Sequence, residues 1–116
     1  MDHSSLESII LSYKEVTKEY PFDLVTAVYK VRGKMFALMG EKLGDSGVNL
    51  KCNPIEAGNL RSAFEGITPG YHMNKMHWNT VDYNSDVPDD LIALMVKNSY
   101  ELVVLKMNKK AQKELL

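Results

Sequence analysis

Between Tyr71 and Asn79 the chain concentrates side chains of the types that contact nucleic acids. Aromatic faces stack on exposed bases, basic and imidazole groups donate to phosphate oxygens, and amides pair with base edges. The segment supplies all three kinds of group, at Tyr71, His72, Asn74, Lys75, His77, Trp78 and Asn79. The alternative is structural: Trp78 belongs to the core, and His77 and Asn79 satisfy backbone groups in a turn.

A second basic group lies on a predicted hairpin. Lys30, Arg32 and Lys34 have even spacing, so all three project to one side of a regular ribbon, although a turn at Gly33 blurs this for Lys34. Like charges at this spacing repel unless an anion or a carboxylate lies nearby. They are candidate phosphate contacts; otherwise they form a solvated edge strand, where lysine discourages aberrant pairing. The C-terminal lysines favour a solubilising helix face over a nucleic-acid arm: Lys106, Lys109, Lys110 and Lys113.

The charges are balanced overall but uneven along the chain. Fourteen basic and fifteen acidic residues leave a formal charge of −1, which excludes a protein that coats nucleic acid through general basicity. Residues 26–81 hold seven bases and four acids, and residues 106–116 hold four lysines and one glutamate. We predict that folding gathers these blocks into one basic patch, with scattered solvated charges as the alternative.

The sequence offers little for catalysis, a metal or a cofactor. No glycine-rich segment has the spacing of a phosphate loop, and Cys52 has the parity of a buried strand position. His72 and His77 are five residues apart, with no carboxylate or cysteine spaced to complete a metal site. We therefore expect a non-catalytic protein without a cofactor or a metal.

Length and composition fit one domain over residues 1–116. The longest apolar run, Leu102 to Leu105, is far below the ~18 residues of a membrane span, so no membrane partner is expected. The single cysteine and the absence of a signal-peptide pattern at the N-terminus favour a reducing cytoplasm.

The N-terminal half predicts a helix followed by three strands. Ser4 and Glu7 have capping-box spacing, and apolar residues recur on one helical face as far as Val16, with Pro21 setting the end near Tyr20. From Thr26 the period changes to two and continues to Arg32, which predicts a hairpin of residues 26–32 and 34–39 around a tight turn at Gly33. Residues 48–52 form a third strand.

The central part predicts a helix and two short strands. Asn53 is the N-cap and Pro54 the first helical residue, and the apolar side comprises Ile55, Leu60, Ala63, Phe64 and Ile67. A turn at residues 68–70 leads to strands at 71–73 and 77–83.

The C-terminal part predicts helices. One starts at Pro88 and breaks near Asn98, where Asn98 and Glu101 repeat the capping-box spacing. A second helix continues through Met107; a buried strand at residues 102–105 is the alternative. Residues 109–116 predict a frayed basic helix.

Three segments resemble the MmcQ/YjbR family of small bacterial proteins. They run from Val28 to Ala37, from Pro69 to Val81, and from Asn98 to Val103 with Asn108 to Lys110. The resemblance implies an α+β fold, in which helices pack on one side of an antiparallel sheet, related in shape to bacterial frataxin. It also implies DNA binding in a double-wing mode, where loops and strands flank the nucleic acid. Frataxin-like iron binding is not expected, because Lys14 and Lys18 interleave with the acids of the N-terminal segment.

Two functional hypotheses follow. The first is a monomeric, non-catalytic DNA-binding protein that uses the Lys30–Lys34 hairpin and the Tyr71–Asn79 segment. The second is a protein-interaction or adaptor module, motivated by the near-zero net charge and by seven methionines, three of them (Met35, Met73 and Met76) near predicted turns.

Overall fold

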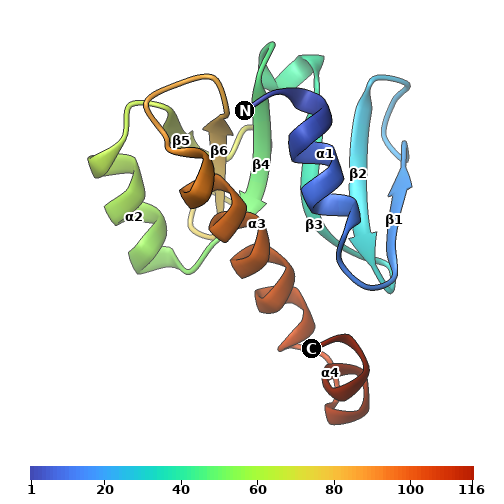
Figure 1. Cartoon of the computed structure of the whole chain (residues 1–116). Helices are drawn as coiled ribbons and strands as arrows, with labels where there is room; N and C mark the ends of the chain where they lie inside the picture. Colours follow the sequence, from blue (N-terminus) through green and yellow to red (C-terminus); the bar gives the residue numbers. More distant parts are fainter.

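A computed structural model describes residues 1–116, which form a six-stranded antiparallel sheet with helices packed against it (Figure 1). The sheet order is β1-β2-β3-β4-β6-β5. The strands are β1 Val16–Glu19, β2 Thr26–Val31, β3 Lys34–Gly40, β4 Gly47–Lys51, β5 Ile67–Pro69 and β6 Trp78–Asp82. The helices are α1 His3–Leu11, α2 Pro54–Ala63, α3 Asp89–Val104 and α4 Lys109–Leu115, with a short 3₁₀ turn η1 at Glu41–Leu43. The predicted α+β class is confirmed. None of the helices has the length and apolar character that crossing a membrane requires.

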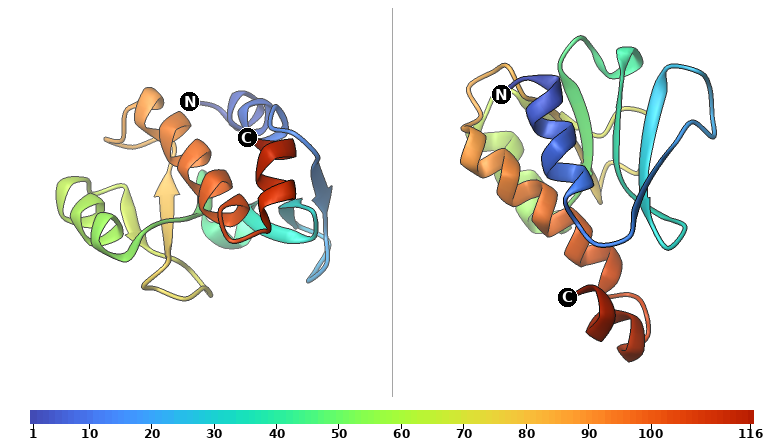
Figure 2. Two further views of the ribbon diagram at one scale, coloured as in Figure 1. Left: turned by 90° about the horizontal axis from the view of Figure 1, so that it is seen from below. Right: turned by 45° about the vertical axis from the view of Figure 1, so that its right-hand side comes forward.

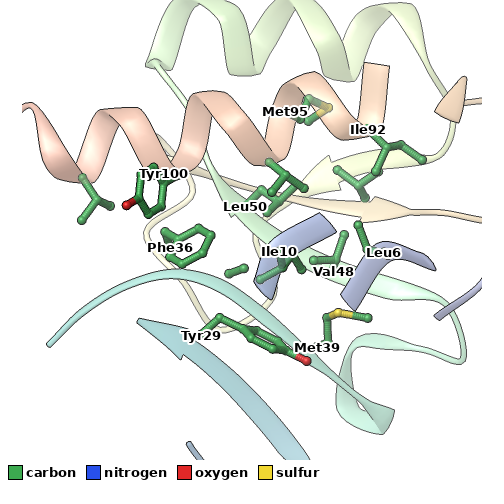
Figure 3. Close-up of a cluster of buried hydrophobic side chains, with 14 of the residues drawn as sticks. Leu6, Ile10, Tyr29, Phe36, Met39, Val48, Leu50, Ile92, Met95 and Tyr100 are labelled. Atoms are coloured by element: carbon green, nitrogen blue, oxygen red, sulfur yellow. The ribbon is translucent and has the colours of Figure 1, made fainter. Parts of the chain in front are cut away.

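The core lies between the sheet and helices α1 and α3 (Figure 3). Leu6 and Ile10 of α1 and Tyr100 of α3 are fully or almost fully buried there against sheet residues such as Phe36 and Leu50. The alternation in β2 sends Ala27, Tyr29 and Val31 into this core, as their period-two spacing predicts.

The opposite face of the sheet carries only a small apolar cluster and no helix. Val28, Leu38 and Trp78 form this cluster, with Met35, Leu43 and Met73 packed at its border. The loop before β6 lies on this side, away from α1 and α3 (Figure 2, left). We call this side the open face.

The β2–β3 hairpin is confirmed, but Arg32 lies in its turn and not in the strand, so it does not continue the alternation of Lys30. Arg32 and Gly33 both have positive φ values, 47° and 80°, which match the left-handed turn that a two-residue hairpin favours. Glycine adopts this conformation without strain, so Gly33 closes the hairpin.

The N-terminal prediction is partly wrong. Helix α1 is capped by Asp2, whose side chain accepts a hydrogen bond from the Ser5 N–H, and it ends at Leu11 rather than near Tyr20. Glu15 has a φ of 59°, which interrupts helical geometry, and Val16 begins β1. A turn at residues 12–15 and the pairing of β1 with the edge of β2 replace the rest of the predicted helix.

The predicted helix from Asn53 is shorter than expected. It has the expected cap, since the Asn53 side chain accepts from the Ile55 and Glu56 N–H groups, but it ends at Ala63. Ile55 is 78% exposed, so it does not belong to a buried face. Ile67 lies in β5, which also contains the predicted turn residues 68 and 69. Residues 71–73 form no strand, because His72 has a φ of 56°.

The predicted break near Asn98 is wrong, and so is the alternative strand at residues 102–105, because α3 runs without interruption from Asp89 to Val104. The Ser99 hydroxyl donates to the carbonyl oxygen of Phe36 and accepts from the Lys51 N–H, so this part of α3 is tied to two strands. Helix α4 lies at the predicted position, but it is docked and not frayed, because it buries Ala111 and Leu115 and the Asn108 side chain accepts from the Ala111 N–H.

Candidate functional site

Two of the three hairpin cations have carboxylate partners. The Nζ atom of Lys30 lies 3.6 Å from Glu19, and the guanidinium of Arg32 lies 2.8 Å from Glu15 and also pairs with Glu114 of α4. These pairs hold the pKa of Arg32 above and that of Glu15 below their usual values. The positive charge that the hairpin offers to a ligand is therefore largely compensated.

Lys34 lies in a different environment, beside two lysines that come from distant parts of the chain. Lys34, Lys51 and Lys106 line a cavity of about 460 Å³ at the end of the sheet where β3 begins and β4 ends. None of the three forms an ion pair. The remaining walls are apolar, and the group that we call the lysine cavity comprises Lys34, Met35, Lys51, Trp78, Val103, Lys106 and Met107.

The lysine cavity is an electrostatically unfavourable arrangement without an anion. Burial holds the pKa of Lys51 below its usual value, and the nearby charge of Lys106 lowers it further. An anion bound between these ammonium groups would remove the repulsion. The geometry therefore favours a phosphate or another anionic group.

Lys51→Met is expected to raise the free energy of unfolding by on the order of 0.5 kcal/mol, because it removes a desolvated charge and keeps the apolar stem. Since the pKa of folded Lys51 is lowered, the folded state loses this proton first as the pH rises. Wild-type stability therefore increases between that lowered pKa and the usual value of 10.5, and the variant lacks this increase. Urea unfolding between pH 7 and 10.5 measures both effects, with the exposed Lys97→Met as the matched control. If Lys51→Met were less stable than Lys97→Met, the charge of Lys51 would not be unfavourable in the folded state.

A larger cavity, of about 610 Å³, opens on the open face. Its apolar walls come from five parts of the chain: Phe22, Met35, Leu38, Leu43, Tyr71, Met73 and Trp78. Its polar walls are Asp23, Thr26, Lys42, Asn49, His72 and Asn74. We call it the aromatic cavity. Met35 and Trp78 line both cavities, so the two are neighbours.

Hydrogen bonds from the sheet fix the segment that carries Tyr71. The Tyr71 N–H donates to Thr80 Oγ1 at 2.9 Å, and Asn49 Nδ2 donates to the Tyr71 carbonyl at 3.0 Å. Thr80 and Asn49 are also joined to each other through their side chains. The ring of Tyr71, 4.2 Å from the His72 ring, is thereby held at the cavity while remaining accessible.

On the other side of the aromatic cavity, Asp23 organises the loop that carries Phe22. Its carboxylate accepts from the Val25 and Thr26 N–H groups and from the Thr26 hydroxyl, and it pairs with Lys42 at 2.9 Å. These interactions, led by the one with Lys42, hold the pKa of Asp23 far below its usual value. Phe22 next to it is 65% exposed.

The rest of the Tyr71–Asn79 segment is mainly structural. Trp78 is only 7% exposed, and Gly70 packs so closely on it that a Cβ on Gly70 would lie 2.7 Å from the Trp78 Cβ. Asn79 is fully buried and accepts from Arg61 Nε at 2.7 Å. Arg61 also donates to the carbonyl groups of Lys75 and Trp78 and so ties the loop to α2.

Three further members of the segment lie near its surface. Asn74 accepts from the Met76 N–H, and the exposed Lys75 donates to the Gly70 carbonyl at 2.9 Å. The backbone of the half-buried His77 accepts a hydrogen bond from the Cys52 N–H and donates one to the Asn74 carbonyl. Cys52 is buried as predicted, and burial raises the pKa of its thiol to about 11.

Lys106, which was expected on a solubilising helix face, lies in the turn after α3 and lines the lysine cavity. Several other lining residues were absent from the sequence prediction, notably Phe22, Asn49 and Lys51. For two of them the sequence did indicate a position outside the core. In β4, Asn49 and Lys51 alternate with buried apolar residues and therefore had to face away from the core. For Phe22 the sequence indicated only that an apolar residue lies outside every predicted helix and strand.

Comparison with known proteins supports the family and the fold. The model of the YjbR family matches residues 11–102. The uncharacterized protein YbdF of Escherichia coli O157:H7 is 32% identical over 111 residues, which is 96% of this chain and 91% of YbdF. The uncharacterized protein YjbR of Escherichia coli K12 is 36% identical over 75 residues, 65% of this chain and 64% of YjbR.

A solved structure supports the same family and fold. The crystal structure of Deinococcus radiodurans protein DR2400, with a domain named DUF419, superposes with a TM-score of 0.88 at 35% identity, covering 97% of this chain and 86% of that one.

Proposed function

This chain belongs to the YjbR family, and we propose that it is a non-catalytic DNA-binding protein that contacts phosphates through the lysine cavity. One observation carries the proposal: three lysines without carboxylate partners converge on one cavity in a chain whose net charge is −1. Such a local concentration of positive charge attracts a polyanion even where the molecule as a whole is nearly neutral.

Neighbouring groups add to this surface. Lys75 is exposed and uses one N–H for Gly70, which leaves two of the three ammonium donors for phosphate oxygens. Tyr71 and His72 supply accessible rings at the adjacent cavity. The hairpin contributes mainly Lys34, since Lys30 and Arg32 are paired with carboxylates.

The proposal is tested by measuring the affinity of the protein for labelled DNA over a series of salt concentrations, using fluorescence anisotropy. Three neutralised phosphates give a slope of log K against log salt of about −2 to −3. An absence of binding at low ionic strength would overturn the proposal, and so would binding that does not depend on salt.

The second candidate is a protein-interaction module, favoured by the loop between β1 and β2. In this loop Leu24 is 94% exposed, and Tyr20, Phe22 and Val25 are exposed as well. Exposed apolar side chains gathered in one place indicate a contact surface. A stoichiometric protein partner that is captured by the wild type, is lost with Leu24→Ser and is free of nucleic acid would favour this candidate.

A further inference from the structure

We propose that the aromatic cavity holds one unpaired nucleobase, so that the protein binds single-stranded DNA in preference to duplex DNA. This inference rests on the proposed function for the phosphate contacts and adds the part of the ligand that enters the protein.

The walls of the aromatic cavity suit a flat, partly apolar group. Its volume of about 610 Å³ lies within the range of small-ligand sites, roughly 300–1,000 Å³. Phe22 and Tyr71 line it and are exposed, while Leu38 and Trp78 are buried and form its inner part. Aromatic rings bind nucleobases by stacking, because every base has a π-face.

The free hydrogen-bonding groups of the cavity are mainly donors. Its one carboxylate, Asp23, is occupied by two backbone N–H groups, a hydroxyl and Lys42. The side-chain Oδ1 of Asn74 accepts from the Met76 N–H, which leaves the side-chain amide N–H groups of Asn74 available. A ligand rich in acceptors, such as a base with ring nitrogens and carbonyl oxygens, complements this inventory.

The aromatic cavity lies next to the proposed phosphate contacts. Met35 and Trp78 line both cavities, so a strand whose phosphates lie on Lys34, Lys51 and Lys106 passes directly beside the aromatic cavity. In a duplex the bases are stacked and paired, and placing one in a pocket costs the energy of extruding it. A single strand avoids this cost.

The site is also preformed. Both backbone hydrogen-bonding groups of Tyr71 are held by Thr80 and Asn49, so little ordering of this residue accompanies binding. The same bonds involve only the backbone of Tyr71, so its side chain can be replaced without removing them.

The deciding experiment compares a ten-nucleotide oligothymidylate with an abasic strand of the same length and charge, and with a duplex of that length. The inference predicts that oligothymidylate binds roughly five- to a hundredfold more tightly than the abasic strand, with a change in the fluorescence of Trp78, the only tryptophan. Equal affinity for oligothymidylate and the abasic strand would overturn the base site and leave the proposed function intact. A duplex that binds as tightly as oligothymidylate would overturn the single-strand preference. No binding of any of the three would overturn the proposed function itself.

Variants separate the two parts of the ligand. Tyr71→Ser is expected to remove most of the difference between oligothymidylate and the abasic strand, without changing the salt dependence. Ile55→Ser, which removes an exposed apolar side chain on α2, is the matched control and should keep that difference. If Tyr71→Ser behaves like Ile55→Ser, the aromatic cavity does not hold the base.

Discussion

Reversing two charges of the lysine cavity, in the variant Lys34→Glu/Lys106→Glu, is expected to weaken binding of single-stranded DNA by roughly a hundredfold at low salt. Each lysine reaches the cavity without a carboxylate partner, so each can give its full charge to a phosphate. The two glutamates would repel the same phosphate and would also pair with Lys51. Both lysines are exposed, so the variant is expected to remain folded.

The matched control is Lys109→Glu/Lys110→Glu, which makes the same change in net charge on exposed positions of α4. The slope of log K against log salt should fall in magnitude by about two in the cavity variant and much less in the control. Equal losses of affinity in the two variants would mean that net charge, rather than the cavity, determines binding.

The largest expected effect on stability comes from Ser99→Ala. The Ser99 hydroxyl is fully buried, donates to the Phe36 carbonyl and accepts from the Lys51 N–H at 2.8 Å. Without it, one carbonyl and one N–H lose a partner, and each such group costs about 1–3 kcal/mol when it is buried. We therefore expect a loss of about 2–4 kcal/mol in the free energy of unfolding, measured by urea denaturation.

Ser62→Ala is the control, since Ser62 is exposed on α2. A loss below about 0.5 kcal/mol in Ser99→Ala would be typical of a surface substitution and would contradict the bridging role of this hydroxyl.

Much of the sheet could be predicted from local patterns. In β2 the alternation places Ala27, Tyr29 and Val31 on one face, and the burial of these residues follows it. The Asn53 cap is also a local feature, and the structure has it. The resemblance to the MmcQ/YjbR family added the arrangement of these elements, which no local pattern contains.

The errors in the predicted secondary structure arise where tertiary contacts, and not local sequence, determine the conformation. Strand β1 is four residues long and only Val16 of it is even half-buried, so nothing local distinguishes it from the continuation of an amphipathic helix. It exists because its backbone pairs with β2. Asn98 and Glu101 have the spacing of a capping box, but the neighbouring Ser99 hydroxyl bonds to strand residues 63 and 48 positions away and α3 continues through them.

The candidate site also depends on tertiary contacts that local sequence does not contain. Lys30, Arg32 and Lys34 have equivalent spacing in sequence, but their surroundings differ. Glu114 reaches Arg32 from the far end of the chain, whereas Lys34 lines a cavity together with Lys106. Counting charges in blocks cannot separate a paired cation from a free one. The predicted gathering of residues 26–81 and 106–116 into one basic patch is therefore met only in part. Lys34 and Lys51 of the first block line a cavity with Lys106 of the second, whereas Lys30 and Arg32 are paired with carboxylates.

Nuclear magnetic resonance titration of ¹⁵N-labelled protein with single-stranded DNA tests most directly where the ligand lies. We predict that the largest amide shift changes fall on Lys34, Lys51 and Lys106, together with the indole N–H of Trp78. Changes confined to the paired hairpin residues Lys30 and Arg32, or to the lysines of α4, would contradict binding at the lysine cavity.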